Sequence, residues 1–295
     1  MEASELLICG SGRIPVLRPV EPINTVDLFP ALHTELVTLL RQLEPQDWHK
    51  PTIAAPWSVK DMVAHLLDTD MRRLSSQRDN FTPPTTEPPP ATYHDLVSLL
   101  DRLNAEWVRA ARRLSPQLLI ELLELVGPQV HHLFTTLDPL APARASVAWA
   151  GETSSLNWFD IAREYTEKWH HQQHIREAVS APLLTSRRWL YPALDTFMRG
   201  LPHTYRAVGA AEGTAVVISI SGEAGGDWTL SKQSQGWQLY QGAVEEPDAR
   251  VQLDQEIAWR LFTKGMAPAD ARRHLAIEGD ELLGVQLLSL LAIMA

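Results

Sequence analysis

The chain has 295 residues, 45% of them hydrophobic and 21% charged, which is the composition of a folded globular protein and excludes global disorder. Its formal net charge of −10 and its lack of a Lys/Arg-rich block argue against a nucleic-acid or anionic-membrane partner. A single cysteine, Cys9, excludes an intrachain disulfide and a cysteine-based zinc cluster.

The first half of the chain predicts helices joined by proline-containing connectors. Residues 1–24 contain several prolines and are expected to wrap the first domain as an extended segment. Leucines at helical spacing predict a helix over 25–44. Ser58 as N-cap, with Asp61 three positions later, predicts a second helix that ends near Arg78.

Prolines separate the second predicted helix from the third. The proline-rich segment 82–90 cannot be helical, and we interpret it as a connector rather than as a proline-rich ligand. Helices are predicted over 93–114 and, as a shorter piece, over 115–126, before a loop rich in Pro, Ala and Gly. A long helix is predicted over 157–179. Four principal helices with these connections predict a helical bundle.

The pattern changes after Pro182 from helical spacing to mostly period-two spacing. Glycine-rich turns separate short runs that favour β-structure. The predicted elements are, in chain order, a helix over 186–205, strands over 214–220, 227–231, 237–240 and 250–253, a helix over 255–263, an extended piece over 275–278 and a terminal helix over 281–294. We therefore predict an N-terminal extension (1–24), a helical domain (25–181) and a small α+β domain (182–295).

The long helix over 157–179 carries a cluster of potential metal ligands. Successive residues of an α-helix are ~100° apart, so Glu167, His171 and His174 share one face and His170 lies beside them. Burying such a polar stripe is costly unless it is paired or binds a metal. Glu-x-x-x-His and His-x-x-x-His spacings both bring two donors to one ion. A solvated, histidine-rich helix surface is the alternative interpretation.

One helix cannot readily supply a complete catalytic set of ligands, so a third ligand from another helix is expected. His65 lies on the predicted helix that follows Ser58 and is the natural candidate. The same helix carries Asp68 and Arg72 at helical spacing from it. Two histidines and one glutamate around an open fourth position are typical of catalytic zinc.

Two segments resemble a known family. The run from Asp47 to Leu66, which contains the sequence PWSVKDMVAHL, and the later run EKWHH, which starts at Glu167, are the matching parts. They resemble the N-terminal domain of mycothiol-dependent maleylpyruvate isomerases, within the DinB/YfiT-like metalloprotein superfamily. The resemblance implies a DinB-like four-helix bundle in which His65, Glu167 and His171 bind a metal.

The resemblance leaves a second set of ligands open. DinB-like relatives use His-x-x-x-His, a spacing that His170 and His174 also satisfy. We favour Glu167 and His171, because Trp169 then keeps the tryptophan position of the isomerase pattern. His174 is in that case a supporting residue or an alternative ligand. One departure is the family's common Cys-Pro-Gly-Trp turn, which is Ala-Ala-Pro-Trp in this chain.

The C-terminal part resembles the sterol-carrier-protein-2-like (SCP2-like) domain that is often fused to this bundle. The matching positions are Asp227–Leu230, Trp237 and Ile277–Asp280. Together the two resemblances cover residues 26–295. They imply a fold class that combines an all-α bundle with a small SCP2-like α+β domain.

The resemblance implies a metal-dependent enzyme that uses a low-molecular-weight thiol. A divalent ion, zinc first and nickel as the alternative, would lower the pKa of a thiol such as mycothiol, bacillithiol or glutathione. The thiolate would then be transferred to a small electrophile or would isomerise it. The residues expected to move protons or orient ligands are His170, His174 and Asp68. The candidates for holding a substrate carboxylate are Arg72, Arg73, Arg272 and Arg273.

Two other functions are open from the sequence. A metal-activated water in the same site would make the protein a hydrolase. A non-enzymatic protein that binds a metal or an apolar ligand is the other alternative. No apolar run reaches the ~20 residues of a membrane span, and the start lacks the basic-then-apolar pattern of a signal peptide. We therefore expect a cytoplasmic monomer or homodimer.

Overall fold

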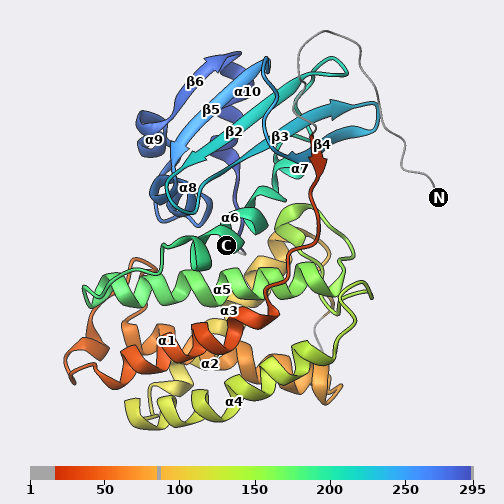
Figure 1. The fold of residues 1–295 in the computed structure, drawn as a ribbon. Coiled ribbons are helices and arrows are strands. Elements are labelled where there is room, and N and C mark those ends of the chain that lie inside the picture. Colours follow the sequence, from red (N-terminus) through yellow and green to blue (C-terminus); the bar gives the residue numbers. More distant parts are fainter. Residues whose placement is uncertain (1–16, 85–87, 294–295) are drawn as a thin grey trace.

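The computed structural model describes residues 17–84 and 88–293, and it combines long helices with a six-stranded sheet. Figure 1 shows helices α1 to α5 packed together in one part and the sheet in the other, with α6 between them. The mixed helical and sheet architecture expected from the sequence is confirmed. Among the described residues, no helix is long and apolar enough to cross a membrane.

The helical part follows the predicted order of elements. The long helices are α1 (Phe29–Arg41), α2 (Val59–Arg73), α3 (Tyr93–Ala111), α4 (Pro116–Thr136) and α5 (Asn157–Ala178). The short helical turns are η1 (Val26–Leu28), η2 (Asp47–His49), η3 (Leu74–Arg78) and η4 (Ala148–Ala150). Helix α2 is central, because it contacts α3, α4 and α5.

A capping box fixes the start of α2, as the sequence predicts. The Ser58 hydroxyl accepts a hydrogen bond from the backbone N–H of Asp61, and the Asp61 carboxylate accepts one from the backbone N–H of Ser58. Arg112, just after α3, pairs with the same carboxylate at 3.0 Å. These contacts set the position of His65, which lies on α2 four residues after Asp61.

Helix α4 is longer than expected. The loop predicted after residue 126 is wrong up to Thr136, because the helix continues through Pro128. A proline inside a helix costs about 3 kcal/mol. Beyond the proline, Val130, Leu133 and Phe134 are buried in the core. Burial of such side chains stabilises by roughly 1.5–3 kcal/mol each, which offsets the cost of the proline.

The terminal helix predicted over 281–294 ends earlier than expected, at Ser289, and its last turn is a 3₁₀ helix. Helix α10 covers only Glu281–Val285 and is followed by the 3₁₀ turn η6 (Gln286–Ser289). The next residues leave the helix because the backbone N–H of Ala292 donates to the carbonyl oxygen of Phe262 at 2.9 Å. A tertiary contact thus replaces the bond that a continued helix would form.

The helix predicted over 186–205 is interrupted near Gly200. Helix α6 covers Arg187–Met198 and α7 covers Leu201–Thr204. At Gly200, between them, an added Cβ would lie 2.9 Å from the Leu290 side chain and 3.2 Å from that of Trp149. A larger residue there would displace the Leu290 side chain, and Pro202, which has no backbone N–H to donate, follows at the start of α7.

The sheet contains the strands expected from the sequence and one more at its edge. The strands are β1 (Arg18–Pro19), β2 (Ala215–Ser221), β3 (Gly226–Gln233), β4 (Gly236–Gln241), β5 (Ala249–Asp254) and β6 (Ala276–Gly279). Their order is β1-β4-β3-β2-β5-β6, and all neighbours are antiparallel except β2 and β5. The remaining helical elements are α8 (Gln255–Phe262), α9 (Pro268–Ala271) and η5 (Arg272–His274).

The N-terminal extension does not wrap the helical part where the structure describes it. Arg18 and Pro19 pair with Gln241 and Tyr240 and so extend the sheet. The prediction for this stretch was wrong because the unpaired edge of β4 offers backbone partners to an extended chain. Residues 1–16 of the expected extension lie outside the described residues.

Helix α5 joins the two parts of the molecule. The indole N–H of Trp169 donates to the carbonyl oxygen of Leu184 at 2.9 Å, and its ring packs edge-on against Trp259 of α8. Arg260, also on α8, donates to Glu177 near the end of α5 at 2.6 Å. The face of α5 that carries Trp169 is thus covered by the C-terminal part of the chain.

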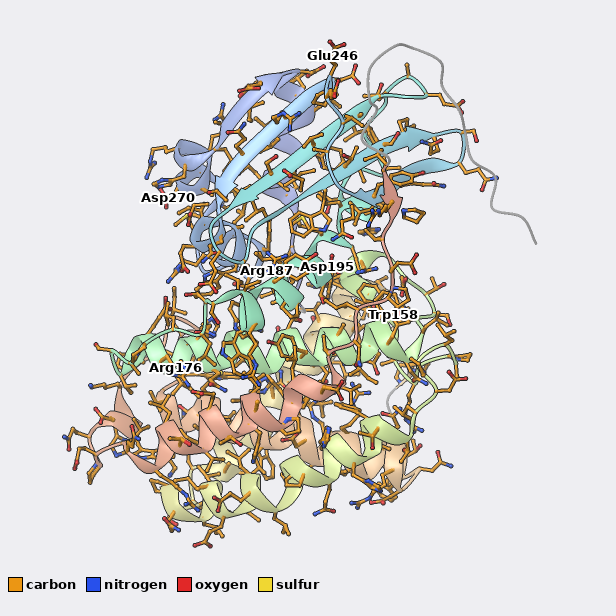
Figure 2. The ribbon with its side chains drawn as sticks, in the orientation of Figure 1. Trp158, Arg176, Arg187, Asp195, Glu246 and Asp270 are labelled. Carbon is orange, nitrogen blue, oxygen red and sulfur yellow. The ribbon has the colours of Figure 1, made fainter. Side chains whose placement is uncertain are left out.

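Helix α6 links these helices to the sheet. Figure 2 shows Arg187 and Asp195 on α6, between the helical part and the strands. The Asp195 carboxylate accepts a hydrogen bond from the indole N–H of Trp228 on β3 at 3.2 Å and pairs with Arg199 at 2.8 Å. The two parts of the molecule are therefore held in a fixed relation, which matters for the cavity between them.

Candidate metal centre

The packing of α2 on α5 brings the three expected metal ligands together. The ring centroids of His65 and His171 are 4.8 Å apart, and Glu167 Oε2 lies 3.4 Å from His171 Nε2. The Trp57 ring lies 4.9 Å from that of His65 and covers it. Two helices that are a hundred residues apart in sequence thus place two imidazoles and a carboxylate in one cluster.

The ligand atoms of this cluster lack partners. His65 Nδ1, Glu167 Oε1 and His171 Nδ1 are buried and form no hydrogen bond with any residue in 17–84 or 88–293. Each buried polar atom without a partner costs about 1–3 kcal/mol, so three in one place are expensive. Imidazole nitrogens and a carboxylate oxygen are ligands that zinc and nickel accept. The cluster therefore fits a divalent ion.

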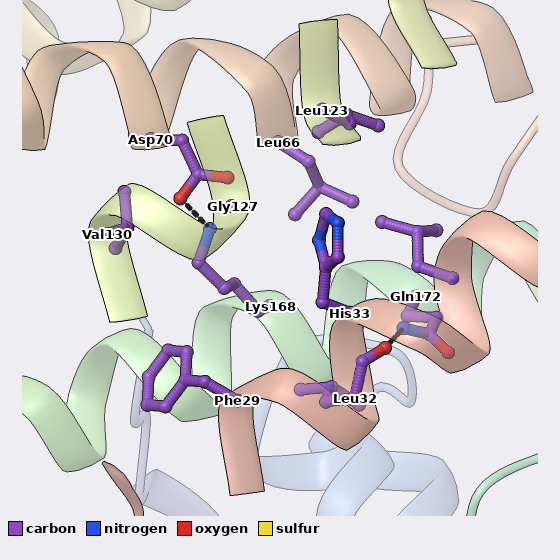
Figure 3. A pocket seen from close by; sticks show the side chains of 11 residues that line it. Phe29, Leu32, His33, Leu66, Asp70, Leu123, Gly127, Val130, Lys168 and Gln172 are labelled. Atoms are coloured by element: carbon purple, nitrogen blue, oxygen red, sulfur yellow. Dashed lines mark hydrogen bonds and ion pairs between the residues drawn. The ribbon is translucent and has the colours of Figure 1, made fainter. Parts of the chain in front are cut away.

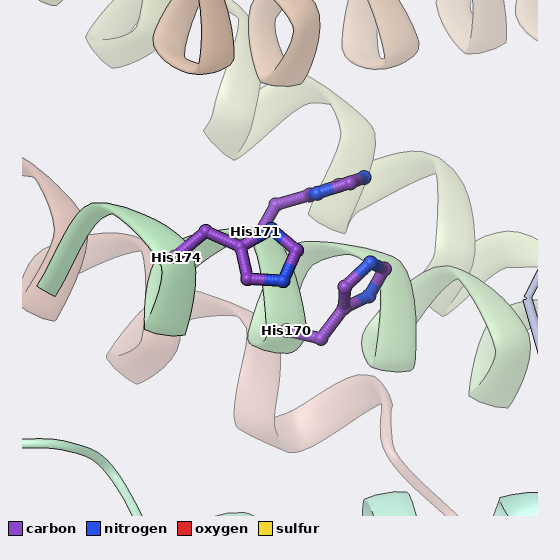
Figure 4. Close-up of side chains that lie close together, drawn as sticks. All are labelled: His170, His171 and His174. Atoms are coloured by element: carbon purple, nitrogen blue, oxygen red, sulfur yellow. The ribbon is translucent and has the colours of Figure 1, made fainter. Parts of the chain in front are cut away.

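A second group of potential ligands overlaps the first. Figure 4 shows His170, His171 and His174 on neighbouring turns of α5, and each offers a nitrogen within 4.8 Å of the others. His170 Nδ1 lies 2.9 Å from the carbonyl oxygen of Thr166 and donates to it, which leaves Nε2 as its acceptor. His174 Nδ1 is buried and has no partner within the described chain. His171 belongs to both groups.

Burial sets the protonation state of the cluster. It lowers the pKa of His65 to about 4, that of His171 to about 3 and that of His174 to about 2. Burial by itself raises the pKa of Glu167, but contact with His171 and the neighbouring His170 bring it down to about 2. At neutral pH the cluster therefore holds neutral imidazoles and a carboxylate, which is the state that binds a cation.

A buried charge network holds α2 against α5 beside the cluster. Arg73 Nη1 donates to Asp160 at 2.6 Å and its Nη2 donates to Glu164 at 3.1 Å. Arg163 donates to the same two carboxylates at 2.7 and 3.1 Å. Burial raises the pKa of both acids, yet the two guanidinium groups lower each pKa to about 2. The structure thus places Arg73, an expected substrate-binding residue, mainly in an ion-pair network.

A cavity of about 870 Å³ opens onto the cluster. It is lined by residues of α2, α3 and α5, by the loops 53–57, 144–146 and 263–265, and by Ile293. All five candidate ligands, His65, Glu167, His170, His171 and His174, line it. Such a volume suits a small-molecule ligand, and walls from both parts of the molecule form it.

The other residues predicted to act in the site differ in position. Arg72 lines the cavity, donates to Asn104 at 2.8 Å and pairs with Asp68 at 3.0 Å. Asp68 is buried behind Arg72, and burial raises its pKa while Arg72 opposes the rise. Arg272 and Arg273 are not among the described residues that line the cavity. They pair with acidic residues at the surface of the sheet part, so the structure does not bring them to the cluster.

Several cations that line the cavity were not predicted from the sequence. They are Arg144, Arg163 and Lys264. Arg163 could have been found, because it lies four residues before Glu167 and so shares its helix face. Arg144 and Lys264 lie in loops, where spacing carries no such signal. Lys264 comes from the C-terminal part of the chain, and only the tertiary structure brings it to the cavity.

A second, much smaller cavity of about 30 Å³ lies on the other side of the α2–α5 contact. Figure 3 shows two polar contacts in its wall: Lys168 Nζ lies 2.5 Å from Asp70 Oδ1, and Gln172 donates to the carbonyl oxygen of Leu32 at 3.1 Å. Burial raises the pKa of Asp70, and Lys168 opposes the rise. This pair joins α2 to α5 one residue beyond Glu167.

Comparisons with known solved structures extend over most of the chain. No curated protein matches the sequence. The chain is similar to the crystal structures of the mycothiol-dependent maleylpyruvate isomerase and of a histidine-to-alanine mutant of it. For each, the identity is 11%, the TM-score is 0.49, and the match covers 80% of this chain and 86% of the other. The SCP2-like assignment of residues 182–295 stays a prediction.

The sequence model of the mycothiol maleylpyruvate isomerase N-terminal domain matches residues 29–176. This region is half of the chain, and it contains His65 on α2 together with Glu167 and the three histidines on α5. It also contains the arginines and acids of the buried charge network. The chain therefore belongs to the mycothiol maleylpyruvate isomerase N-terminal domain family.

Proposed function

We propose that the protein is a metal-dependent enzyme that uses a low-molecular-weight thiol to isomerise a small electrophilic substrate or to form a conjugate with it. His65, Glu167 and His171 are the proposed metal ligands. The observation that carries the proposal is the group of buried ligand atoms without partners in the wall of the 870 Å³ cavity. Membership of the family supports a thiol, with mycothiol as the first candidate.

The chemistry follows from these groups. A bound zinc or nickel ion would supply a positive charge that lowers the pKa of a thiol to below neutrality. In the isomerisation, the sulfur forms a bond to one carbon of a C=C bond conjugated to a carbonyl, and the electron pair moves to the carbonyl oxygen. Rotation about the resulting C–C single bond and expulsion of the sulfur leave the isomerised alkene and the original thiolate. Protonation of the adduct instead gives a conjugate.

The residues of the chain have separate tasks in this scheme. At neutral pH Glu167 is a carboxylate and the imidazoles of His65 and His171 are neutral, which is the state suited to binding the metal at the thiol end of the cavity. His170 is the proposed proton acceptor, at Nε2, because its Nδ1 proton is engaged by Thr166. His174 supports it from the next turn, with ring centroids 5.2 Å apart. Trp57 and Ile293 contribute apolar walls to the cavity.

Elemental analysis of the purified protein, followed by calorimetric titration with mycothiol, tests the proposal. We expect close to one zinc or nickel per chain and thiol binding that disappears when the metal is removed. Glu167→Ala should lose at least ~90% of the metal, because it removes one of three ligands. Glu121→Ala, on the exposed face of α4, is the matched control. Full thiol binding by the metal-free protein would contradict the proposal, and turnover of an ester without thiol would indicate a hydrolase.

A further inference from the structure

Several cations line the cavity although the chain is acidic. Of the described residues that line it, five are Arg or Lys and three are Asp or Glu, whereas the whole chain has a net charge of −10. The lining cations are Arg72, Arg73, Arg144, Arg163 and Lys264. Asp160 and Glu164 balance Arg73 and Arg163, and Asp68 pairs with Arg72, so most of this charge is paired. A cation in a concave wall can bind a small anion where one of its donors is left free.

Arg163 differs from the other cations in how it is held. Its Nε and Nη2 both donate to Asp160 Oδ1, at 3.3 and 2.7 Å, and Nη2 also donates to Glu164. Its Nη1 forms no hydrogen bond to any part of the chain that the structure describes, yet it is not among the fully buried atoms without partners. Nη1 is therefore a fixed donor that is accessible from the cavity.

The position of Arg163 matches the place where a substrate would lie. It is one helical turn before Glu167 on α5, a spacing that puts Cβ atoms ~6 Å apart. The charge of Arg163 is one of the influences that lower the pKa of Glu167, after burial, which raises it, and the histidines. A substrate group bound at Nη1 would thus lie beside the proposed metal ligands rather than at the cavity mouth.

The other cations are less suited to this task. Both Nη atoms of Arg73 are occupied by Asp160, Glu164 and Gln77. The side chain of Arg72 is 36% exposed, against 16% for Arg163, and it is engaged by two neighbours. Arg144 and Lys264 are exposed residues of loops. A charge-assisted hydrogen bond is strongest where the donor is fixed and shielded from water, and Arg163 meets both conditions.

We propose that Arg163 is the residue that binds the carboxylate of the electrophilic substrate, through Nη1. Asp160 and Glu164 orient the guanidinium group, and the proposed metal ligands lie one turn away. This inference rests on the proposed function, which assigns the thiol and the electrophile to the same cavity.

The test compares a charged substrate with a neutral one. The zinc-loaded wild type and Arg163→Lys are assayed with mycothiol and either maleylpyruvate or dimethyl maleate, which carries no carboxylate. We expect kcat/KM for maleylpyruvate to fall by about 10- to 100-fold, mainly through KM, because a hydrogen bond to a charged group is lost. The value for dimethyl maleate should change by less than about threefold. An equal loss for both substrates, or no loss for either, would overturn the inference.

Arg73→Lys is the matched control. It disturbs the same two carboxylates, Asp160 and Glu164, but both Nη atoms that it removes are already engaged within the chain. We expect it to change the two kcat/KM values by the same factor. If Arg73→Lys discriminates between the substrates as strongly as Arg163→Lys, the assignment to Arg163 is wrong. If Arg163→Lys does not fold, the double variant Arg163→Gln/Glu164→Gln, which removes one charge of each sign, replaces it.

A binding measurement separates this inference from the proposed function. If the wild type turns over neither substrate with mycothiol, the proposed function fails. Calorimetry then measures the binding of maleate to the zinc-loaded and metal-free proteins, and this measurement tests the role of Arg163 by itself. A rise in Kd of about tenfold or more in Arg163→Lys supports the carboxylate site. An unchanged Kd, or a wild type that does not bind maleate, overturns it.

Discussion

Two polar clusters lie on opposite sides of the contact between α2 and α5, and they differ in how their atoms are satisfied. On one side, Asp70 and Lys168 form an ion pair at 2.5 Å beside a small cavity of about 30 Å³. On the other side, His65, Glu167 and His171 leave three buried atoms without partners beside a cavity of about 870 Å³. The same two helices thus build a stabilising pair and a binding site.

This difference shows where the structure is adapted to a ligand. Most buried polar groups that serve only the fold find partners within the chain, as Asp70 and Arg73 do. Of the eight buried side-chain atoms without partners among the described residues, four belong to the cavity wall, on His65, Glu167, His171 and His174, and the other four belong to residues that do not line it. The concentration of such atoms in one cavity wall, rather than the number of histidines, is therefore the physical signal of the candidate site.

The largest expected effect is on the satisfied pair. Lys168→Met leaves the Asp70 carboxylate buried and uncompensated, which should lower the free energy of unfolding by about 3–5 kcal/mol. The double variant Asp70→Leu/Lys168→Met removes both charges and should recover most of that loss. Urea unfolding of the metal-free proteins measures both. If the single variant is as stable as the wild type, the pair does not hold α2 against α5.

Acidification should destabilise the unsatisfied cluster in the metal-free protein. Burial lowers the pKa of His65 from 6.5 to about 4, so the unfolded chain binds a proton that the folded chain does not. The stability is fully present above pH 6.5 and is lost as the pH falls from 6.5 to about 4, by about 3 kcal/mol for this residue alone. Unfolding free energies at pH 7 and 4.5 measure the loss. His65→Gln should show a loss smaller by about that amount, and an equal loss would refute the assignment.

Zinc should stabilise the protein only while the cluster is intact. At a free concentration of about 100 times Kd, a ligand that binds only the folded state raises the unfolding free energy by about 2.7 kcal/mol. We expect this stabilisation to raise the melting temperature of the wild type and to raise that of His65→Gln little or not at all. His49→Gln, which replaces an exposed histidine, should behave like the wild type. Equal stabilisation of all three proteins would mean that zinc binds elsewhere.

Local patterns in the sequence predicted much of the fold. Helical spacing and the Ser58 cap placed α1 and α2, and alternation placed β2 to β5, because these signals depend on neighbours in sequence. The errors occurred where tertiary contacts changed the outcome. Buried Val130 and Phe134 carry α4 past its proline, and the bond from Ala292 to Phe262 ends the last helix early.

The sequence by itself determined the family, the five candidate ligands and the helices that carry them, since helix periodicity fixes which residues share a face. Only the tertiary structure decided which ligand atoms lack partners, because hydrogen bonding between α2 and α5 depends on how they pack. It also decided that Arg163, Arg144 and Lys264 line one cavity while Arg272 and Arg273 do not. Distances between residues a hundred positions apart follow from packing of the whole core, which no local pattern contains.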